Sequence, residues 1–101
     1  MTTDNYISLI KEWAKERGID KARPEKQMLK LMEEAGELAE GLAKGNEDEV
    51  IDSIGDVFVV LVILSQQLNL DFHSCVEEAY NTIKSRKGKT INGIFVKQED
   101  I

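Results

Sequence analysis

The chain has 101 residues, enough for one domain with a modest hydrophobic core, and we treat residues 1–101 as that single domain. Hydrophobic residues make up 42% of the chain and charged residues 32%, a balance that excludes an intrinsically disordered protein. The net charge of -6 argues against nucleic-acid binding, because phosphate backbones are bound mainly by Lys and Arg. Nucleotides fit this charge only if metal cations bridge their phosphates to the protein.

The first half of the chain predicts two helices. Residues 4–17 carry apolar side chains at helical spacing and end at Gly18, a typical helix terminator. A second helix is predicted over residues 24–44, because Pro24 suits the first helical position and Gly45 follows the last apolar residue. Its apolar stripe runs from Met28 to Leu42.

The second half predicts two more helices. Asn46 followed by Glu49 has the pattern of a capping box, so the third helix begins there and ends near residue 68. Residues 57–64 of this helix are all apolar, which predicts burial on every side. Asp71 is the expected N-cap of a fourth helix that ends near residue 87.

The tail, residues 90–101, predicts a β-hairpin, because Asn92 and Gly93 lie between β-favouring residues. The fold class is therefore all-α, a four-helix-bundle-like subunit with a short extended C-terminal tail. Three partner helices of this length would cover the third helix poorly. We therefore expect a homodimer that completes a larger bundle.

Cysteine content and hydropathy indicate the cellular compartment to expect and whether the chain would span a membrane. The single cysteine, Cys75, cannot form an intramolecular disulfide, and we expect a cytoplasmic protein without a signal peptide. The apolar stretch 57–64 is far shorter than the ~20 residues of a membrane-spanning helix, so no membrane association is expected. His73 is the only histidine, which excludes a di-iron site built from two Glu-x-x-His motifs.

Carboxylates are concentrated on the second and third predicted helices. Residues advance about 100° each around a helix, so two rows form, one on each helix. These rows comprise Glu33, Glu34 and Glu37, then Glu49, Asp52 and Asp56. Glu37 and Asp56 stand among core positions, where a charge is costly unless a cation neutralises it. The spacing alone fits two interpretations equally well, a Mg²⁺ site or solvated charges on amphipathic helices.

The acidic segments resemble a known family. Residues 33–38 read Glu-Glu-Ala-Gly-Glu-Leu and residues 54–57 read Ile-Gly-Asp-Val, which is similar to the signature of the MazG-like nucleotide pyrophosphohydrolases, part of the all-α NTP pyrophosphatase superfamily. The resemblance covers residues 24–89. It implies hydrolysis of a nucleoside triphosphate, NTP or dNTP, to the monophosphate and pyrophosphate, with Mg²⁺ (or Mn²⁺) as cofactor, in a dimeric or tetrameric helical bundle.

Carried over by position, the resemblance implies metal ligation by Glu34, Glu37, Asp52 and Asp56. Glu33 or Glu34 would orient or deprotonate the attacking water. The signature places a second glutamate at position 53, where this chain has Ser53, and Asp52 is the substitute; Glu49 with Asp52 is the alternative pair. The basic residues Lys84, Arg86 and Lys87, with Lys89, would bind the substrate phosphates, or stabilise a helix C-terminus.

Three readings of function stay open at this stage. The first is the pyrophosphohydrolase, the second a non-catalytic helical dimer that binds a nucleotide or a protein partner, and the third a related enzyme acting on dUTP or on a phosphoribosyl nucleotide. The aromatic residues Tyr6, Trp13 and Tyr80 are interpreted as core positions more readily than as base-stacking ones. Gly36 and Gly55 are expected to allow close helix packing beside the carboxylates.

Overall fold

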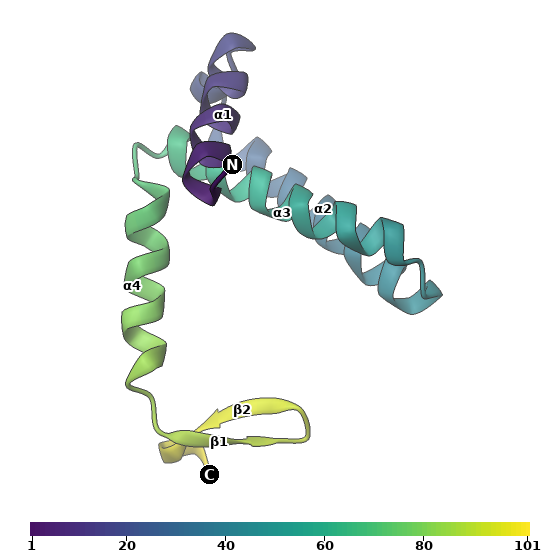
Figure 1. Ribbon diagram of the computed structural model, residues 1–101, viewed down its shortest axis with the longest axis vertical. Coiled ribbons are helices and arrows are strands. Elements are labelled where there is room, and N and C mark those ends of the chain that lie inside the picture. Colours follow the sequence, from purple (N-terminus) through teal and green to yellow (C-terminus); the bar gives the residue numbers. More distant parts are fainter.

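Four helices carry most of the chain in the computed structural model, which describes residues 1–101 (Figure 1). They are α1 (Thr3–Glu16), α2 (Pro24–Lys44), α3 (Glu47–Gln67) and α4 (Phe72–Lys84), followed by strands β1 (Gly88–Ile91) and β2 (Ile94–Lys97). Short 3-10 turns occupy Ile19–Lys21 and Gln98–Asp100. The predicted all-α fold class with a small C-terminal hairpin is confirmed.

The helix ends follow local capping chemistry. Pro24 opens α2, and Gly45 ends it with a φ of 66°, a left-handed conformation that favours glycine. The side chain of Asn46 accepts a hydrogen bond from the Glu49 N–H at 3.2 Å at the start of α3. Asp71 caps α4 in the same way. The fourth helix ends at Lys84 and not near residue 87, since the chain passes through the Ser85 cap into β1, which begins at Gly88. The Lys87 carbonyl accepts a hydrogen bond from the Gln98 N–H at 2.7 Å within the tail.

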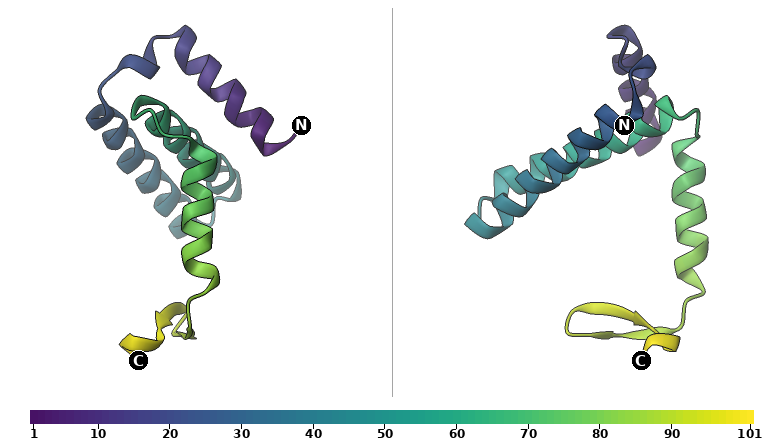
Figure 2. Two further views of the ribbon diagram at one scale, coloured as in Figure 1. Left: turned by 90° about the vertical axis from the view of Figure 1, so that its left-hand side faces the viewer. Right: turned by 180° about the vertical axis from the view of Figure 1, so that it is seen from behind.

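Helices α2 and α3 form an antiparallel helical hairpin, and α1 packs across α3 (Figure 2). The two helices of the hairpin approach closely at Gly41, where a Cβ atom would lie 3.2 Å from Cγ2 of Val50. Gly36 and Gly55 were expected to allow such packing, but both are exposed and a Cβ on either would meet nothing within 4 Å. That expectation is wrong for the single chain.

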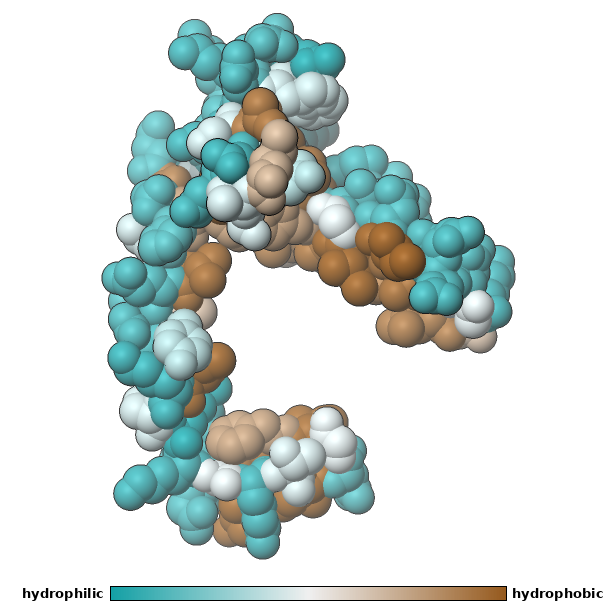
Figure 3. All heavy atoms as spheres, viewed as in Figure 1, coloured by the Kyte–Doolittle hydropathy of each residue, from teal (hydrophilic) through white to brown (hydrophobic).

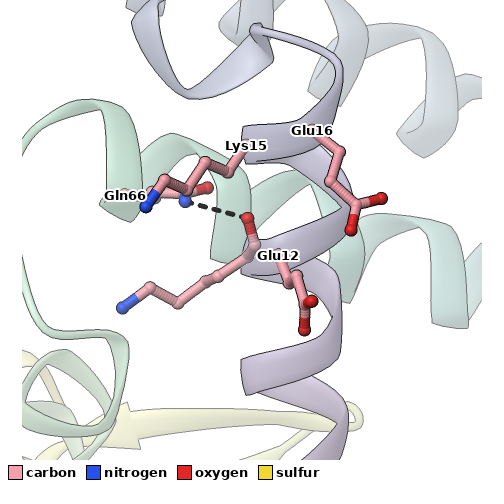
Figure 4. Close-up of a pocket in the computed structure, with 5 residues that line it drawn as sticks. Glu12, Lys15, Glu16 and Gln66 are labelled. Atoms are coloured by element: carbon pink, nitrogen blue, oxygen red, sulfur yellow. Dashed lines mark hydrogen bonds between the residues drawn. The ribbon is translucent and has the colours of Figure 1, made fainter.

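Two glutamines at the end of α3 fasten the N-terminal segment. The Gln66 side-chain amide donates a hydrogen bond to the Lys11 carbonyl at 3.1 Å (Figure 4), and the Gln67 amide donates one to the Ile19 carbonyl at 2.9 Å. The hollow beside Gln66 is otherwise lined by two lysines and two glutamates, Lys11, Lys15, Glu12 and Glu16. Its formal charges cancel, so it has no excess charge of either sign.

Helix α4 and the β-hairpin extend away from the other three helices (Figures 1 and 2). An edge-to-face contact of Phe58 with Phe72, ring centroids 5.3 Å apart, supports the base of α4. Because α4 leaves the other helices, burial within one chain is sparse: only 8 of 101 residues are buried. In the apolar stretch 57–64, Val60, Val62 and Ile63 are buried and the other residues only partly, so the predicted burial on every side is not reached within one chain.

The C-terminal tail forms the predicted β-hairpin. Strands β1 and β2 pair antiparallel, with Gly88 opposite Lys97 and Ile91 opposite Ile94. Asn92 and Gly93 form the turn with φ values of 51° and 82°, the conformation that Asn-Gly turns favour. Separately, none of the helices combines the length and apolar character needed to cross a membrane.

Candidate metal centre

Carboxylates from α2 and α3 meet where the two helices pack. Glu34 and Glu37 are three residues apart and so share one face of α2, while Asp56 faces them from α3. One oxygen from each of the three side chains lies within 4.8 Å of the other two. We call Glu34, Glu37 and Asp56 the acid cluster. The convergence of the two helices on one group of acids follows the pattern predicted from the sequence.

Glu34 is the innermost member of the acid cluster. The residue is only 5% exposed, and its Oε1 lies 3.2 Å from Nζ of Lys30. Its other oxygen, Oε2, is buried and has no hydrogen-bond partner. Leaving a buried carboxylate oxygen without a partner is costly, and a divalent cation would satisfy it. This unpartnered oxygen is the observation in the chain that best fits a bound metal.

The surroundings of the other two acids favour their protonated forms. The pKa of Glu37 is raised above its ordinary value, mainly because a protonated Glu37 can donate a hydrogen bond to the Glu34 carboxylate, and also because Glu34 repels its negative charge. Burial raises the pKa of Asp56, and the charges of Asp52 and Glu34 raise it further. Both shifts mean that the cluster resists carrying all of its negative charges at once. A group of oxygen ligands with excess negative charge fits Mg²⁺ or a similar hard cation.

The remaining acidic candidates lie outside the cluster. Asp52 is exposed and close enough to raise the pKa of Asp56, but its oxygens are not among those grouped within 4.8 Å. Glu33 is exposed and its Oε1 lies 3.5 Å from Nζ of Lys30. Glu49 lies near the Asn46 cap, with its Oε2 3.4 Å from the Asn46 side-chain nitrogen. Asp52 is thus a neighbour of the cluster, and Glu33 and Glu49 are engaged elsewhere.

Ser53 occupies the position at which the resembled signature has a glutamate. The residue is 2% exposed, so it is packed inside the helical hairpin. A serine side chain is far shorter than a glutamate, and the acid cluster therefore contains three close carboxylates where the signature would place four.

The basic candidates lie far from the acid cluster within one chain. Lys84 ends α4, and Arg86 and Lys87 follow it, at the end of α4 that is remote from the α2–α3 hairpin (Figures 1 and 2). Lys84 and Arg86 line a surface hollow together with Tyr80, Ile83 and Phe95. A single chain therefore does not bring these cations to the acids.

Sequence reasoning missed the role of Lys30. It pairs with Glu34 at 3.2 Å and with Glu33 at 3.5 Å, and both acids raise the pKa of its ammonium group. The i,i+4 spacing of Lys30 and Glu34 on one helix could have indicated this pair. Lys30 pairs with one oxygen of Glu34, and the other oxygen has no partner.

These observations define an all-α protein with an acidic centre between two antiparallel helices. Comparison with known proteins narrows the class, because residues 22–91 match the MazG nucleotide pyrophosphohydrolase domain. This match covers more than half of the chain, and the protein belongs to that family.

One curated relative matches over part of its length. The chain is 50% identical over 66 residues to an uncharacterized 18.2 kDa protein from the rep-hol intergenic region of Haemophilus phage HP1 (strain HP1c1). The aligned part covers 64% of this chain and 40% of the phage protein, so the chain spans less than half of that relative. No solved structure matches the chain significantly.

Proposed function

We propose that this protein is a Mg²⁺-dependent pyrophosphohydrolase that cleaves an NTP or dNTP into the monophosphate and pyrophosphate. The observation that carries the proposal is the acid cluster, in which Glu34 has a buried oxygen, Oε2, without a hydrogen-bond partner. Membership of the nucleotide pyrophosphohydrolase family supports the substrate class. Mn²⁺, which accepts similar oxygen ligands, would serve in place of Mg²⁺.

Glu34, Glu37 and Asp56 would hold the metal, with Asp52 at the solvent side of the cluster. When bound, the metal polarises phosphoryl oxygens and makes a nearby water more acidic. The side chains do the rest of the positioning. Lys30 pairs with Oε1 of Glu34 at 3.2 Å, which restricts rotation of the carboxylate.

Glu33 and Glu34 are both candidates for the residue that orients the attacking water. Glu34 is favoured because it belongs to the cluster and is desolvated, which strengthens its hydrogen bonds to a water or a substrate. Glu33 is exposed and engaged with Lys30, so we assign it the lesser part of holding that lysine in place.

We further propose that a second copy of the chain supplies the phosphate-binding cations Lys84, Arg86 and Lys87. Apolar side chains gather where the α2–α3 hairpin, α4 and the β-hairpin face one another (Figure 3). We call this the concave face, and we assign to it the apolar residues that share one side of their helix by spacing: Ile51, Ile54, Phe58 and Leu61 on α3 and Phe72, Val76, Tyr80 and Ile83 on α4. Leu61, Phe72 and Val76 line one hollow between these two helices. Ile51 is 63% exposed and Ile54 58% exposed, which is costly for a single chain. A homodimer that buries this face would pack the partner's α4 against the α2–α3 hairpin that carries the acid cluster, on the side of α3 away from Asp56.

The test is to incubate the purified protein with a panel of NTPs and dNTPs plus Mg²⁺ and to separate the products. We expect pyrophosphate and the monophosphate, without orthophosphate, and no turnover in EDTA. Glu37→Gln and Asp56→Asn should abolish turnover while circular dichroism shows that both variants remain helical. Release of orthophosphate from the wild type would refute the proposed bond cleavage.

Ser53 favours a second candidate, a nucleotide-binding relative without turnover, because the cluster contains one carboxylate fewer than the signature predicts. Calorimetry distinguishes the two functions. If nucleotide binds in the presence of Mg²⁺ and no member of the panel is hydrolysed, the protein is the binding module.

A further inference from the structure

A second feature adjoins the acid cluster on the other side of Asp56. Between α1 and α3 lies a hollow of about 440 Å³, lined by Tyr6, Leu9, Ile10, Trp13, Asp56 and Val59. We call it the aromatic hollow. Five of its six lining residues are apolar, and the exception, Asp56, belongs to the acid cluster. The hollow and the cluster therefore share one wall.

The two aromatic residues of the hollow are not core residues in this fold. Trp13 is 46% exposed and Tyr6 is 53% exposed, although the sequence favoured burial for both. Trp13 is nevertheless held in place: the Arg17 guanidinium lies 4.3 Å from the centre of its ring, and Arg17 also donates a hydrogen bond to the Trp13 carbonyl at 3.1 Å. The hollow thus presents a positioned, half-exposed indole.

The proposed subunit contact does not account for this exposure. Residues advance about 100° each around α3, so Asp56 and Val59 lie on roughly the opposite side of the helix from Ile54 and Phe58 of the concave face. A partner that covers the concave face leaves the aromatic hollow open. The occupant of the hollow must then be something that also reaches Asp56.

A single nucleotide can fill the hollow and reach Asp56 at the same time. Its phosphates need the cation held by the acid cluster, and its base is a flat aromatic ring that stacks on indole and phenol faces. Asp56 is common to the cluster and the hollow, so phosphates at the cluster place the rest of the nucleotide beside the hollow. An apolar peptide or a lipid chain would gain nothing from the carboxylate in the wall.

We propose that the aromatic hollow is the base-binding subsite, in which the nucleobase stacks against Trp13 and packs beside Tyr6. This proposal rests on the proposed function, because it assumes that the acid cluster binds the phosphates of the same molecule. It makes the protein a nucleotide enzyme that discriminates against inorganic polyphosphate. Trp13 contacts the base and not the reacting phosphorus, so it contributes to KM and not to kcat.

Trp13 is the only tryptophan in the chain, so its fluorescence reports on the hollow alone. With Mg²⁺ present, we expect a nucleoside triphosphate analogue with a methylene bridge between the α and β phosphorus atoms to quench this emission to saturation. Inorganic tripolyphosphate with Mg²⁺, which has no base, should leave it unchanged. Quenching by both compounds, or by neither, would overturn the subsite.

Kinetics of variants provide an independent test. Stacking of one base is worth about 1–3 kcal/mol, so Trp13→Leu should raise KM for the nucleotide about 5- to 150-fold and leave kcat unchanged. Trp13→Phe keeps an aromatic face and should restore most of the affinity. Equal KM values for the wild type and Trp13→Leu would refute the subsite and leave the proposed hydrolase intact.

Sedimentation of the Trp13→Leu variant tests whether a second subunit, and not a base, occupies the hollow. An unchanged oligomeric state is expected; a lower one would show that the hollow is a subunit contact and would overturn the proposal. If no nucleotide is hydrolysed by the wild type, the hydrolase proposal fails by itself, and the fluorescence titration still decides whether a base occupies the hollow.

Discussion

Neutralising Glu34 should stabilise the metal-free protein. An oxygen of Glu34 lies within 4.8 Å of one from Asp56. Two unit charges at this separation repel by about 0.9 kcal/mol in water and about 3.5 kcal/mol at the effective dielectric constant near a protein surface. Asp56 is half-buried, so we take a value near the lower end, and the lost ion pair with exposed Lys30 offsets part of the gain. Glu34→Gln should therefore raise the free energy of unfolding by about 1 kcal/mol in EDTA.

Urea denaturation followed by circular dichroism, at low ionic strength and with EDTA, measures this difference. A gain of 1 kcal/mol corresponds to about 4–8 °C in Tm for a domain of this size. Mg²⁺ at one hundred times its Kd should stabilise the wild type by about 2.7 kcal/mol and the variant hardly at all. Glu33→Gln is the matched control, because Glu33 pairs with the same Lys30 but lies outside the acid cluster.

The control should change the free energy of unfolding by less than about 0.5 kcal/mol, as is usual at the surface, and keep the Mg²⁺ response. The reasoning fails if Glu34→Gln destabilises the metal-free protein and retains the full stabilisation by Mg²⁺. That result would mean that Glu34 is a structural partner of Lys30 and not part of a cation site.

Three further predictions follow from the same geometry. The raised pKa values of Glu37 and Asp56 mean that the folded state holds protons more tightly than the unfolded state, so their contribution to stability in EDTA should fall as pH rises through those values. Urea titrations at several pH values measure this fall, which should be smaller in Glu34→Gln, where only burial and Asp52 still raise the pKa of Asp56. Ser53→Glu should lower stability in EDTA by about 1–3 kcal/mol, since position 53 is packed, and Mg²⁺ should recover part of the loss in thermal melts. Mixing inactive Glu34→Gln with inactive Arg86→Ala should restore pyrophosphate release if each site draws on two subunits; inactive mixtures after subunit exchange would place both groups in one chain.

Local chemistry explains why the helices could be predicted from the sequence. Pro24, Gly45, Asn46 and Asp71 each have a conformation or hydrogen bond that their residue type dictates, so they mark helix ends in any surrounding. The Asn-Gly turn of the tail is equally local. The end of α4 adjoins β1, whose pairing with β2 joins residues further along the chain, and the prediction there was three residues too long.

Only part of the acid cluster could be predicted from the sequence, because only part of it depends on local spacing along one helix. Glu34 and Glu37 share a helix face by spacing alone, but the approach of Asp56 depends on how α2 and α3 pack. Spacing treats Asp52 and Glu33 as equal to their neighbours, whereas in the fold neither contributes an oxygen to the group within 4.8 Å. The packing glycine is Gly41, not Gly36 or Gly55, because contacts between helices are decided by crossing geometry that a single sequence does not display.

The exposure of Trp13 and Tyr6 illustrates the limit of helical periodicity. An apolar residue on a helix face indicates that the face is covered by something, and the same spacing results whether the cover is the core, another subunit or a ligand. Only the placement of α1 beside Asp56 shows that this face adjoins the acid cluster. The inference about the base therefore requires the fold.

Binding of Mn²⁺, followed by electron paramagnetic resonance, tests the central claim most directly, because free Mn²⁺ gives a signal that is lost when the ion is bound. The account predicts that the wild type and Glu33→Gln bind Mn²⁺ with similar affinity, and that Glu34→Gln, Glu37→Gln and Asp56→Asn each weaken it at least about tenfold, as expected for loss of a ligand or its close support. Equal Mn²⁺ affinity in the wild type and all three cluster variants would contradict the account, since the metal would then be bound elsewhere.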